Sequence, residues 1–543
     1  MIRPGHVVAA LGTAVRNENV RRAELAWGAA IAAEWAQFVA LGVFAYQHGG
    51  AAAVGVAGFV RLLPAAVIAP FAAAFGDRFR RERFLVAMAL LGCLALAGSA
   101  AGAFAGAKVP VLVFAGLLGI SSTLIRPALQ ALLPSLARTP EELIAANGAT
   151  STIESIGTLV GPLVAGLLVS FADVGSVFAV GAASLLAAAA LFGRVRVESR
   201  IELTAATAGE SAREMVAAGF RAIARTPGTR LIVALTTAQT FVRGCLNVLI
   251  VVAAFRVLHG GGAEVGYLTA AIGVGGLIGA VGAMTLEGRR LAGPFGLALV
   301  FWGIPIMLIA PRPYLFLALL LLAIVGGANS VVDVTVFTLL QRVVPDDVLT
   351  RVLGIVWGLA MGGVAVGSIA APILVSAIGP RPAFAVVGSI LPFLTLASYR
   401  RLVRLDQGVA PGEELELVSG VPMFAPLSVA MKERVAANLH PLSVAAGTVV
   451  VQAGEAGDRF YIVGAGELSI DATGRHTTAH RADYFGEIAL LRDIPRTATV
   501  TATVDSQLYA LLRDDFLAAV TGHSAAHAAG EAVTEARLVG AKS

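Results

Sequence analysis

One eight-residue segment, here called the repeated phrase, occurs twice in the sequence. Its copies are HGGAAAVG at residues 48–55 and HGGGAEVG at residues 259–266. Six of the eight positions are identical, and the copies lie 211 residues apart (259 minus 48). A second pair, GISSTLIRPALQALLP from Gly119 and GGANSVVDVTVFTLLQ from Gly326, has a similar offset of 207 (326 minus 119). Two matches in the same order at similar offsets indicate an internal duplication.

The composition places both copies in a membrane. Of the 543 residues, 57% are hydrophobic and only 14% are charged, whereas soluble proteins have about 25% charged residues. About twelve apolar runs between Ala23 and Tyr399 are long enough to cross a hydrocarbon core of roughly 30 Å. Each copy of the phrase follows the first span of a set of six. We therefore predict two pseudo-symmetric six-helix halves at residues 1–193 and 229–404, related by an axis along the membrane normal.

The loops between these runs alternate in charge. One set of loops carries nearly all the arginines: Arg78, Arg80, Arg81 and Arg83; Arg194, Arg196 and Arg200; Arg289 and Arg290; Arg342; Arg400, Arg401 and Arg404. The positive-inside rule places this set, together with both chain termini, in the cytoplasm. The predicted location is thus the plasma or inner membrane, with residues 194–228 forming a cytoplasmic segment that contains an amphipathic helix. Topology explains the net charge of +5 without a nucleic-acid partner.

The loop FGDRFRRERF at residues 75–84 resembles the signature loop of the major facilitator superfamily, G-x-x-x-D-R-x-x-R-R. In that family the loop locks the two halves together, which makes Asp77, Arg78, Arg80 and Arg81 candidates for a gate. Ala73 replaces the leading glycine, and Glu82 replaces the final arginine. GTLVGPLVAG at residues 157–166 resembles the G-x-x-x-G-P motif of facilitator antiporters and exporters, carried by Gly157, Gly161, Pro162 and Gly166. Glycines at this spacing also allow close helix packing without any role in export.

Six charged residues fall within or near the predicted spans. Charges are costly there and usually face a cavity, so we treat all six as candidates for the transport site: Glu34, Arg61, Arg126, Glu154, Arg243 and Asp333. Glu34 and Glu154 are candidates for proton transfer, because a carboxylate in a low-dielectric cavity takes up a proton more readily than one in water. Helix capping or snorkelling is the alternative for the arginines. The 207 offset aligns Arg126 with Asp333, and an ion pair between them is one hypothesis.

After Arg404 the sequence becomes polar. Residues 405–420 have the composition of a linker, and residues 421–543 contain short strand-like runs typical of a β-jelly-roll. YFGEIALLRDIPRTATV at residues 484–500 resembles the phosphate-binding cassette of cyclic-nucleotide-binding domains. The resemblance implies that Glu487 binds the ribose hydroxyl and Arg496 the cyclic phosphate of cAMP or cGMP. The other expected contacts come from Gly486, Ile488, Ala489 and Thr497. The segment 521–538, where the family has a lid over the base, lacks aromatic residues.

The expected fold class is a membrane all-α, twelve-helix major facilitator fold plus a C-terminal soluble β-jelly-roll cyclic-nucleotide-binding domain with flanking helices. The expected function is a proton-coupled exporter of hydrophobic or amphipathic small molecules, regulated by cyclic nucleotide. A non-transporting membrane sensor and a lipid or siderophore exporter are the alternatives. A cyclic-nucleotide-gated channel is disfavoured, because the sequence has no carbonyl filter. No nucleophile elbow, metal cluster or Walker loop suggests an enzyme, a metal or a cofactor, and the oligomeric state is left open.

Overall fold

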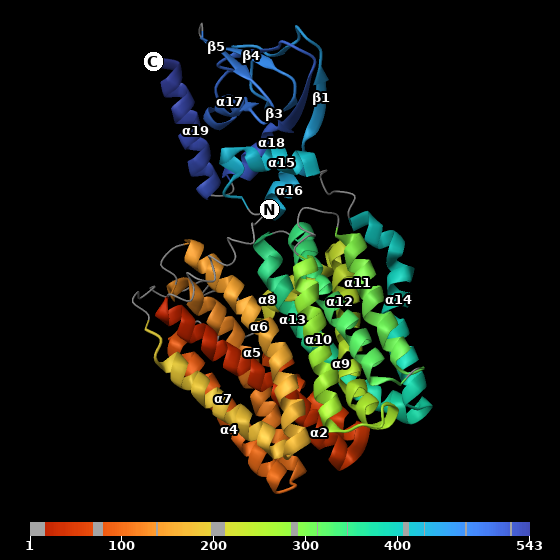
Figure 1. The fold of residues 1–543 in the computed structure, drawn as a ribbon. Helices are drawn as coiled ribbons and strands as arrows, with labels where there is room; N and C mark the ends of the chain where they lie inside the picture. Colours follow the sequence, from red (N-terminus) through yellow and green to blue (C-terminus); the bar gives the residue numbers. More distant parts are fainter. Residues whose placement is uncertain are drawn as a thin grey trace. The chain divides into compact units, whose positions relative to one another are not determined.

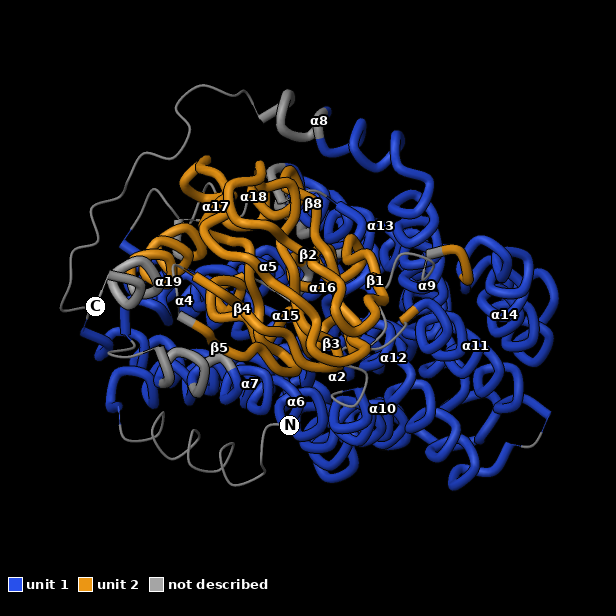
Figure 2. The backbone as a smooth tube through the Cα atoms, turned by 90° about the horizontal axis from the view of Figure 1, so that it is seen from above, with its two compact units in different colours: residues 1–285, 292–402 blue, residues 286–291, 403–543 orange. Residues whose placement is uncertain are grey.

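The computed structural model describes residues 17–68, 80–136, 140–196, 212–283, 291–311, 313–344, 346–405, 412–427, 429–472, 475–521 and 524–542. The chain divides into two compact units, which Figure 2 colours separately. Residues 1–285 and 292–402 make the first unit, and residues 286–291 and 403–543 make the second. The first is helical, and the second contains all the strands that the described residues form.

The described part of the first unit contains eleven helices that are long and apolar enough to span a membrane. The first of them, α2 (Glu18–Ile68), is 51 residues long and contains non-helical backbone at Gly49 and Gly50. Gly50 has a φ of 61°, a left-handed conformation that glycine adopts without steric cost. Helix α2 therefore supplies two spans, which confirms the predicted total of twelve. The first copy of the repeated phrase forms this kink.

The remaining helices follow the duplicated pattern. The first half continues with α4 (Arg81–Phe104), α5 (Lys108–Leu136), α6 (Pro140–Phe171) and α7 (Val174–Gly193). After α8 (Ala212–Arg225), the second half contains α9 (Pro227–Val252), the π-helix η2 (Ala253–Val257), α10 (Gly262–Ala283), α11 (Ala292–Ile309), α12 (Leu315–Val343), α13 (Asp346–Ile378) and α14 (Pro380–Leu405). Helices α5 and α12 are each 29 residues long and are offset by 207 at both ends. Helix α8 lies in the predicted cytoplasmic segment.

The two halves pack against each other through α2 with α13 and through α6 with α10. Figure 1 shows the first half in red to yellow and the second half in green to teal. Glycines make this approach close. A Cβ atom built on Gly266 would lie 2.5 Å from the Cα of Gly166, and one on Gly273 would lie 2.9 Å from the Cα of Leu159. These contacts extend from the ends of the spans opposite the arginine-rich loops, here called the outer side, to about their middle. The halves are therefore closed against each other on the outer side.

The second unit is a jelly-roll of two four-stranded antiparallel sheets with strand orders β1-β8-β3-β6 and β2-β7-β4-β5. The strands are β1 (His440–Val444), β2 (Val449–Val451), β3 (Arg459–Ala465), β4 (Leu468–Ala472), β5 (Arg475–Ala479), β6 (Tyr484–Phe485), β7 (Thr499–Ala502) and β8 (Ser506–Leu512). The flanking helices are α15 (Gly412–Gly420), η4 (Pro422–Phe424), α16 (Val429–Ala437), α17 (Glu487–Arg492), α18 (Arg513–Thr521) and α19 (Ser524–Lys542).

An aromatic cluster holds the flanking helices against the β3 side of this unit. The Phe460 ring stacks on Phe516 at 4.8 Å between centroids and meets Phe424 edge-on at 5.7 Å. Leu417 and Val418 of α15, a segment predicted as linker, are also buried in this core. Burial of these large side chains is the main source of stability for a domain of this size.

Candidate functional site

The intramembrane charges of the first half form two ion pairs that join different spans. Arg61 Nη2 donates to Glu34 Oε1 at 2.9 Å, linking the two spans of α2. Arg126 Nη2 lies 3.1 Å from Glu154 Oε2, linking α5 to α6. A charge inside a membrane protein needs a partner of this kind. The four residues that the sequence singled out in this half are thus brought together as two charge-balanced pairs.

The second half adds its two charges to the same electrostatic network. Asp333 of α12 lies close enough to interact with Arg243 of α9 and with Arg126 of the first half, and it accepts a hydrogen bond from Asn329 Nδ2 at 2.9 Å. Glu154 interacts with Asp333 and Glu34 as well as with its partner. The ion pair that Arg126 makes is with Glu154 and not with Asp333, which acts on Arg126 only as a more distant charge.

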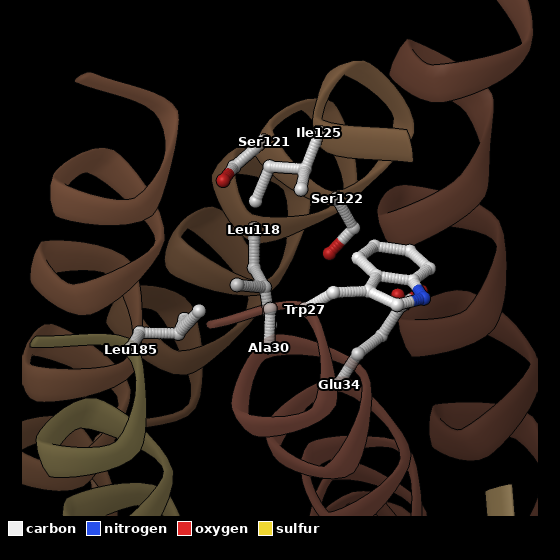
Figure 3. A pocket seen from close by; sticks show the side chains of 8 residues that line it. All are labelled: Trp27, Ala30, Glu34, Leu118, Ser121, Ser122, Ile125 and Leu185. Atoms are coloured by element: carbon white, nitrogen blue, oxygen red, sulfur yellow. The ribbon is translucent and has the colours of Figure 1, made fainter. Parts of the chain in front are cut away.

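A small cavity lies beside this network within the first half (Figure 3). Trp27, Ala30 and Glu34 of α2 line it together with side chains from α5 and α7, which are Leu118, Ser121, Ser122, Ile125 and Leu185. The Nε1 atom of Trp27 is buried and has no hydrogen-bond partner among the described residues. The polar groups of this cavity are therefore Glu34, the indole N–H and the hydroxyls of Ser121 and Ser122.

The predicted G-x-x-x-G-P motif has a packing role that the structure describes directly. Gly157 and Gly161 face Ile31, Ala32 and Trp35 of α2, with no room for a side chain. Gly166 instead faces the second half, where a Cβ would lie 2.9 Å from the carbonyl oxygen of Ala263. The buried Pro162 lies within α6. The motif thus joins α6 both to its own half and to the opposite half.

The predicted gating loop is described only in part. Asp77 and Arg78 lie outside the described residues. Arg80 makes an ion pair with Glu82 at 2.7 Å, and Arg81 Nη1 donates to the carbonyl oxygen of Ala131 in α5 at 2.6 Å. Both described arginines therefore make contacts inside the first half.

One buried acidic residue escaped the sequence analysis. Glu24, near the start of α2, is 4% exposed and accepts a hydrogen bond from the Thr150 hydroxyl of α6. Glu24 lies two residues after Arg22 in the sequence and was not among the predicted site residues. The apolar residues that surround it in sequence, AELAWGAA from Ala23, were the available signal.

The second unit brings the predicted cyclic-nucleotide residues to one place. Gly486 has a φ of 94° and precedes α17, whose first residue, Glu487, is 1% exposed. Arg496 is 6% exposed, and its Nη1 donates to the carbonyl oxygen of Gly486 at 3.2 Å. A Cβ on Gly486 would lie 2.6 Å from Nη1 of Arg496. Only glycine satisfies both the left-handed backbone and this close approach.

The guanidinium of Arg496 is held by other contacts in this structure. Its Nη2 donates to the carbonyl oxygen of Arg459 at 2.8 Å and to Oδ1 of Asp458 at 3.4 Å, and its Cζ lies 5.9 Å from the centre of the Tyr461 ring. Burial and the nearby Asp458 carboxylate raise the pKa of the Tyr461 phenol, while Arg496 acts in the opposite direction. The charge of Arg496 is thus only weakly compensated, since the Asp458 side chain is 67% exposed.

The remaining predicted contacts surround this arginine. Ala489 is buried in α17, Ile488 is half-buried, and Thr497 is exposed next to Arg496. Helix α19 is one of the predicted flanking helices, and Arg492 of α17 makes an ion pair with its Glu531 at 2.7 Å. A fixed arginine beside a buried carboxylate can bind a phosphate and a sugar hydroxyl together.

Comparison with known proteins adds two family assignments and several relatives. The family described as Major Facilitator Superfamily matches residues 25–359, and the family described as Cyclic nucleotide-binding domain matches residues 441–523. A cAMP-dependent protein kinase regulatory subunit of Yarrowia lipolytica is 40% identical over 99 residues, which are 18% of this chain and 26% of the relative. The same kind of subunit from Dictyostelium discoideum is 36% identical over 116 residues, 20% of this chain and 35% of the relative.

A cyclic nucleotide-gated potassium channel of Rhizobium etli is 33% identical over 101 residues, 19% of this chain and 28% of the relative. The chain therefore spans between about a quarter and a third of the length of these curated relatives. These similarities concern a shared part of otherwise different proteins.

Proposed function

This chain belongs to the major facilitator superfamily and carries a C-terminal cyclic nucleotide-binding domain, and from that premise we propose that it is a secondary active transporter regulated by cAMP or cGMP. The proposed transport is export of hydrophobic or amphipathic small molecules driven by protons. The observation that carries this proposal is the network of three acidic residues and three arginines that spans both halves of the membrane unit.

Protonation of this network would change how the halves attract each other. Glu154 is paired with Arg126, and Arg126 also interacts with Asp333 of the opposite half. When a proton neutralises Glu154, the attraction between Arg126 and Asp333 becomes the main compensation for the arginine charge. Proton binding therefore favours a different arrangement of the halves, which is the requirement for coupling protons to alternating access.

The outer closure supports a transporter that alternates between two states. The Tyr46 and Phe255 rings stack across the two halves at 4.5 Å, and Arg256 Nε donates to the Tyr46 hydroxyl at 3.1 Å. These polar and aromatic contacts lie close to the outer ends of the spans and can separate without leaving a charge buried. Phe255 and Arg256 belong to the π-helix η2, a feature often found at functional sites.

The proposed regulation of transport depends on cyclic-nucleotide binding to the second unit. A cyclic nucleotide alters transport only if it binds two transport states with different affinity. Similarity to regulatory subunits named as cAMP-dependent supports a cyclic nucleotide as the ligand of Glu487 and Arg496. Thr497 does not discriminate between the two bases, so both cAMP and cGMP are candidates.

The test is transport by the full chain in proteoliposomes under an imposed pH gradient. The probes are ethidium, 8-anilinonaphthalene-1-sulfonate and Nile red, which are amphipathic and differ in charge. We expect gradient-dependent movement of at least one probe, and loss of the dependence on the pH gradient in Glu34→Gln or Glu154→Gln. If no probe moves while the protein binds cyclic nucleotide, the protein is a non-transporting sensor and the proposal is wrong.

A further inference from the structure

A second, narrow pocket lies between the two halves of the membrane unit. Its walls come from both spans of α2, from α9 and α10, and from α13, and they are mainly aliphatic. The polar side chains among them are Arg61, Asn247 and Ser368. The Ser368 hydroxyl donates to the carbonyl oxygen of Val364 at 2.9 Å. Because the walls belong to two halves that move relative to each other in a facilitator, separation of the halves widens this pocket.

Arg61 has a buried donor, its Nε–H group, that nothing in the described structure uses. The residue is 8% exposed, its Nη2 binds Glu34, and its Cζ lies 5.8 Å from the centre of the Phe38 ring. Its Nε is buried and has no hydrogen-bond partner among the described residues. A buried donor without a partner is destabilising. A ligand that supplies an acceptor removes this cost, which makes its free energy of binding more favourable.

The charge of the pocket is already balanced. Arg61 is the one charged side chain among the described residues that line it, and Glu34 neutralises it. A ligand with a net charge would enter an apolar cavity without a counter-ion, which is strongly unfavourable. An uncharged ligand with an oxygen acceptor satisfies the Nε–H group and leaves the ion pair intact.

We propose that this pocket is the substrate subsite and that it selects uncharged apolar molecules carrying a carbonyl, ester or ether oxygen, which accepts a hydrogen bond from Arg61 Nε. The proposal rests on the proposed transport function and specifies its substrate class. The aliphatic walls bind the apolar body, and the Nε–H group of Arg61 orients the oxygen. Lipophilic cations and anions are excluded by the existing Arg61–Glu34 pair.

The test is binding of four naphthalene probes to the full chain in nanodiscs, followed by naphthalene fluorescence and corrected with empty nanodiscs. The probes are 2-naphthylacetamide, 2-naphthylacetate, 2-(2-naphthyl)ethylammonium and 2-ethylnaphthalene, which share an apolar body and differ in charge and acceptor. We expect the amide to bind about tenfold more tightly than 2-ethylnaphthalene, and the two charged probes to bind more weakly than the amide. Equal binding of the amide and 2-ethylnaphthalene, or tightest binding of the ammonium probe, would overturn the proposal.

Two variants separate the donor from the charge balance. In Glu34→Gln the arginine charge is uncompensated, so we expect the acetate probe to become the tightest ligand. In Glu34→Gln/Arg61→Met the donor and both charges are absent, so the amide should lose its tenfold advantage over 2-ethylnaphthalene. Ala57→Leu narrows the pocket and should weaken all four probes. Thermal unfolding confirms that each variant is folded, and unchanged amide preference in the double variant contradicts the proposal.

The subsite and the transport function can fail separately. If the amide binds as expected but no probe is transported, the pocket is a ligand site in a protein that does not transport. If ethidium is transported under a pH gradient while the amide has no advantage in binding, the protein is a transporter and the proposed substrate class is wrong.

Discussion

Replacement of Arg496 by alanine should nearly abolish cyclic-nucleotide binding. The guanidinium can make two charge-assisted hydrogen bonds to a cyclic phosphate, each contributing about 1.5–3 kcal/mol. We expect binding to replace the long contact of Arg496 with the exposed Asp458, at 3.4 Å, and to keep its bonds to the backbone carbonyl groups. The net loss in Arg496→Ala is therefore about 3–4 kcal/mol, which corresponds to a roughly 200- to 1,000-fold weaker affinity.

The assay is isothermal titration calorimetry of cAMP and cGMP with the purified full chain. Arg492→Ala is the matched control, because Arg492 lies in the same cassette but is directed to Glu531 of α19. Its exposed ion pair predicts a change in affinity of less than about threefold. Arg496→Ala also removes hydrogen bonds to two backbone carbonyl groups, so thermal unfolding must show that the variant is folded. An affinity within threefold of wild type in folded Arg496→Ala would refute the assignment of this arginine to the phosphate.

Three further predictions concern packing, backbone conformation and pH. Gly266→Ala should destabilise the outer-closed state by about 1–3 kcal/mol, because its Cβ would meet Gly166. It should therefore raise the labelling of a cysteine introduced at an outer end of the spans. Gly354→Ala, which has open space around it, should leave labelling unchanged. Asp493 has a φ of 53° and pairs with Arg513. Both Asp493→Ala and Asp493→Gly remove this pair, but alanine also strains the left-handed backbone, so Asp493→Ala should lower the unfolding free energy by about 1 kcal/mol more. Equal effects of the two substitutions would contradict this backbone argument. Because the pKa of Tyr461 is raised in the folded protein, the unfolded chain loses the phenol proton at a lower pH. The free energy of unfolding should therefore fall as the pH rises above about 10. Chemical denaturation of Tyr461→Phe should show a smaller fall over the same pH range.

The membrane architecture was predictable because its signals are long and repeated. Apolar length, the repeated phrase and the arginine-rich loops each report on whole spans. The described residues form twelve spans in two halves, as predicted. The clustering of the proposed cyclic-nucleotide residues was predictable for a different reason. The cassette is a short contiguous segment, so Gly486, Glu487 and Arg496 are brought together by local chain geometry.

The pairings inside the membrane were not predictable, because they depend on how helices rotate against one another. The sequence identified Arg126 and Asp333 as equivalent positions, but the direct partner of Arg126 is Glu154 of the adjacent helix. The π-helix η2 at the end of α9 was also not expected, since an extra residue in a helical turn leaves no clear periodic signal. The buried Nε of Arg61 could be recognised only from the atoms around it.

The most direct test of the account is the response of transport to cyclic nucleotide in the full chain. Proteoliposomes containing wild type or Arg496→Ala would be compared under the same pH gradient, with and without saturating cAMP or cGMP on the side of the cyclic-nucleotide domain. We expect nucleotide to change the initial rate of probe movement in wild type and to leave the rate in Arg496→Ala unchanged. A wild-type rate that is the same with and without bound nucleotide would contradict it.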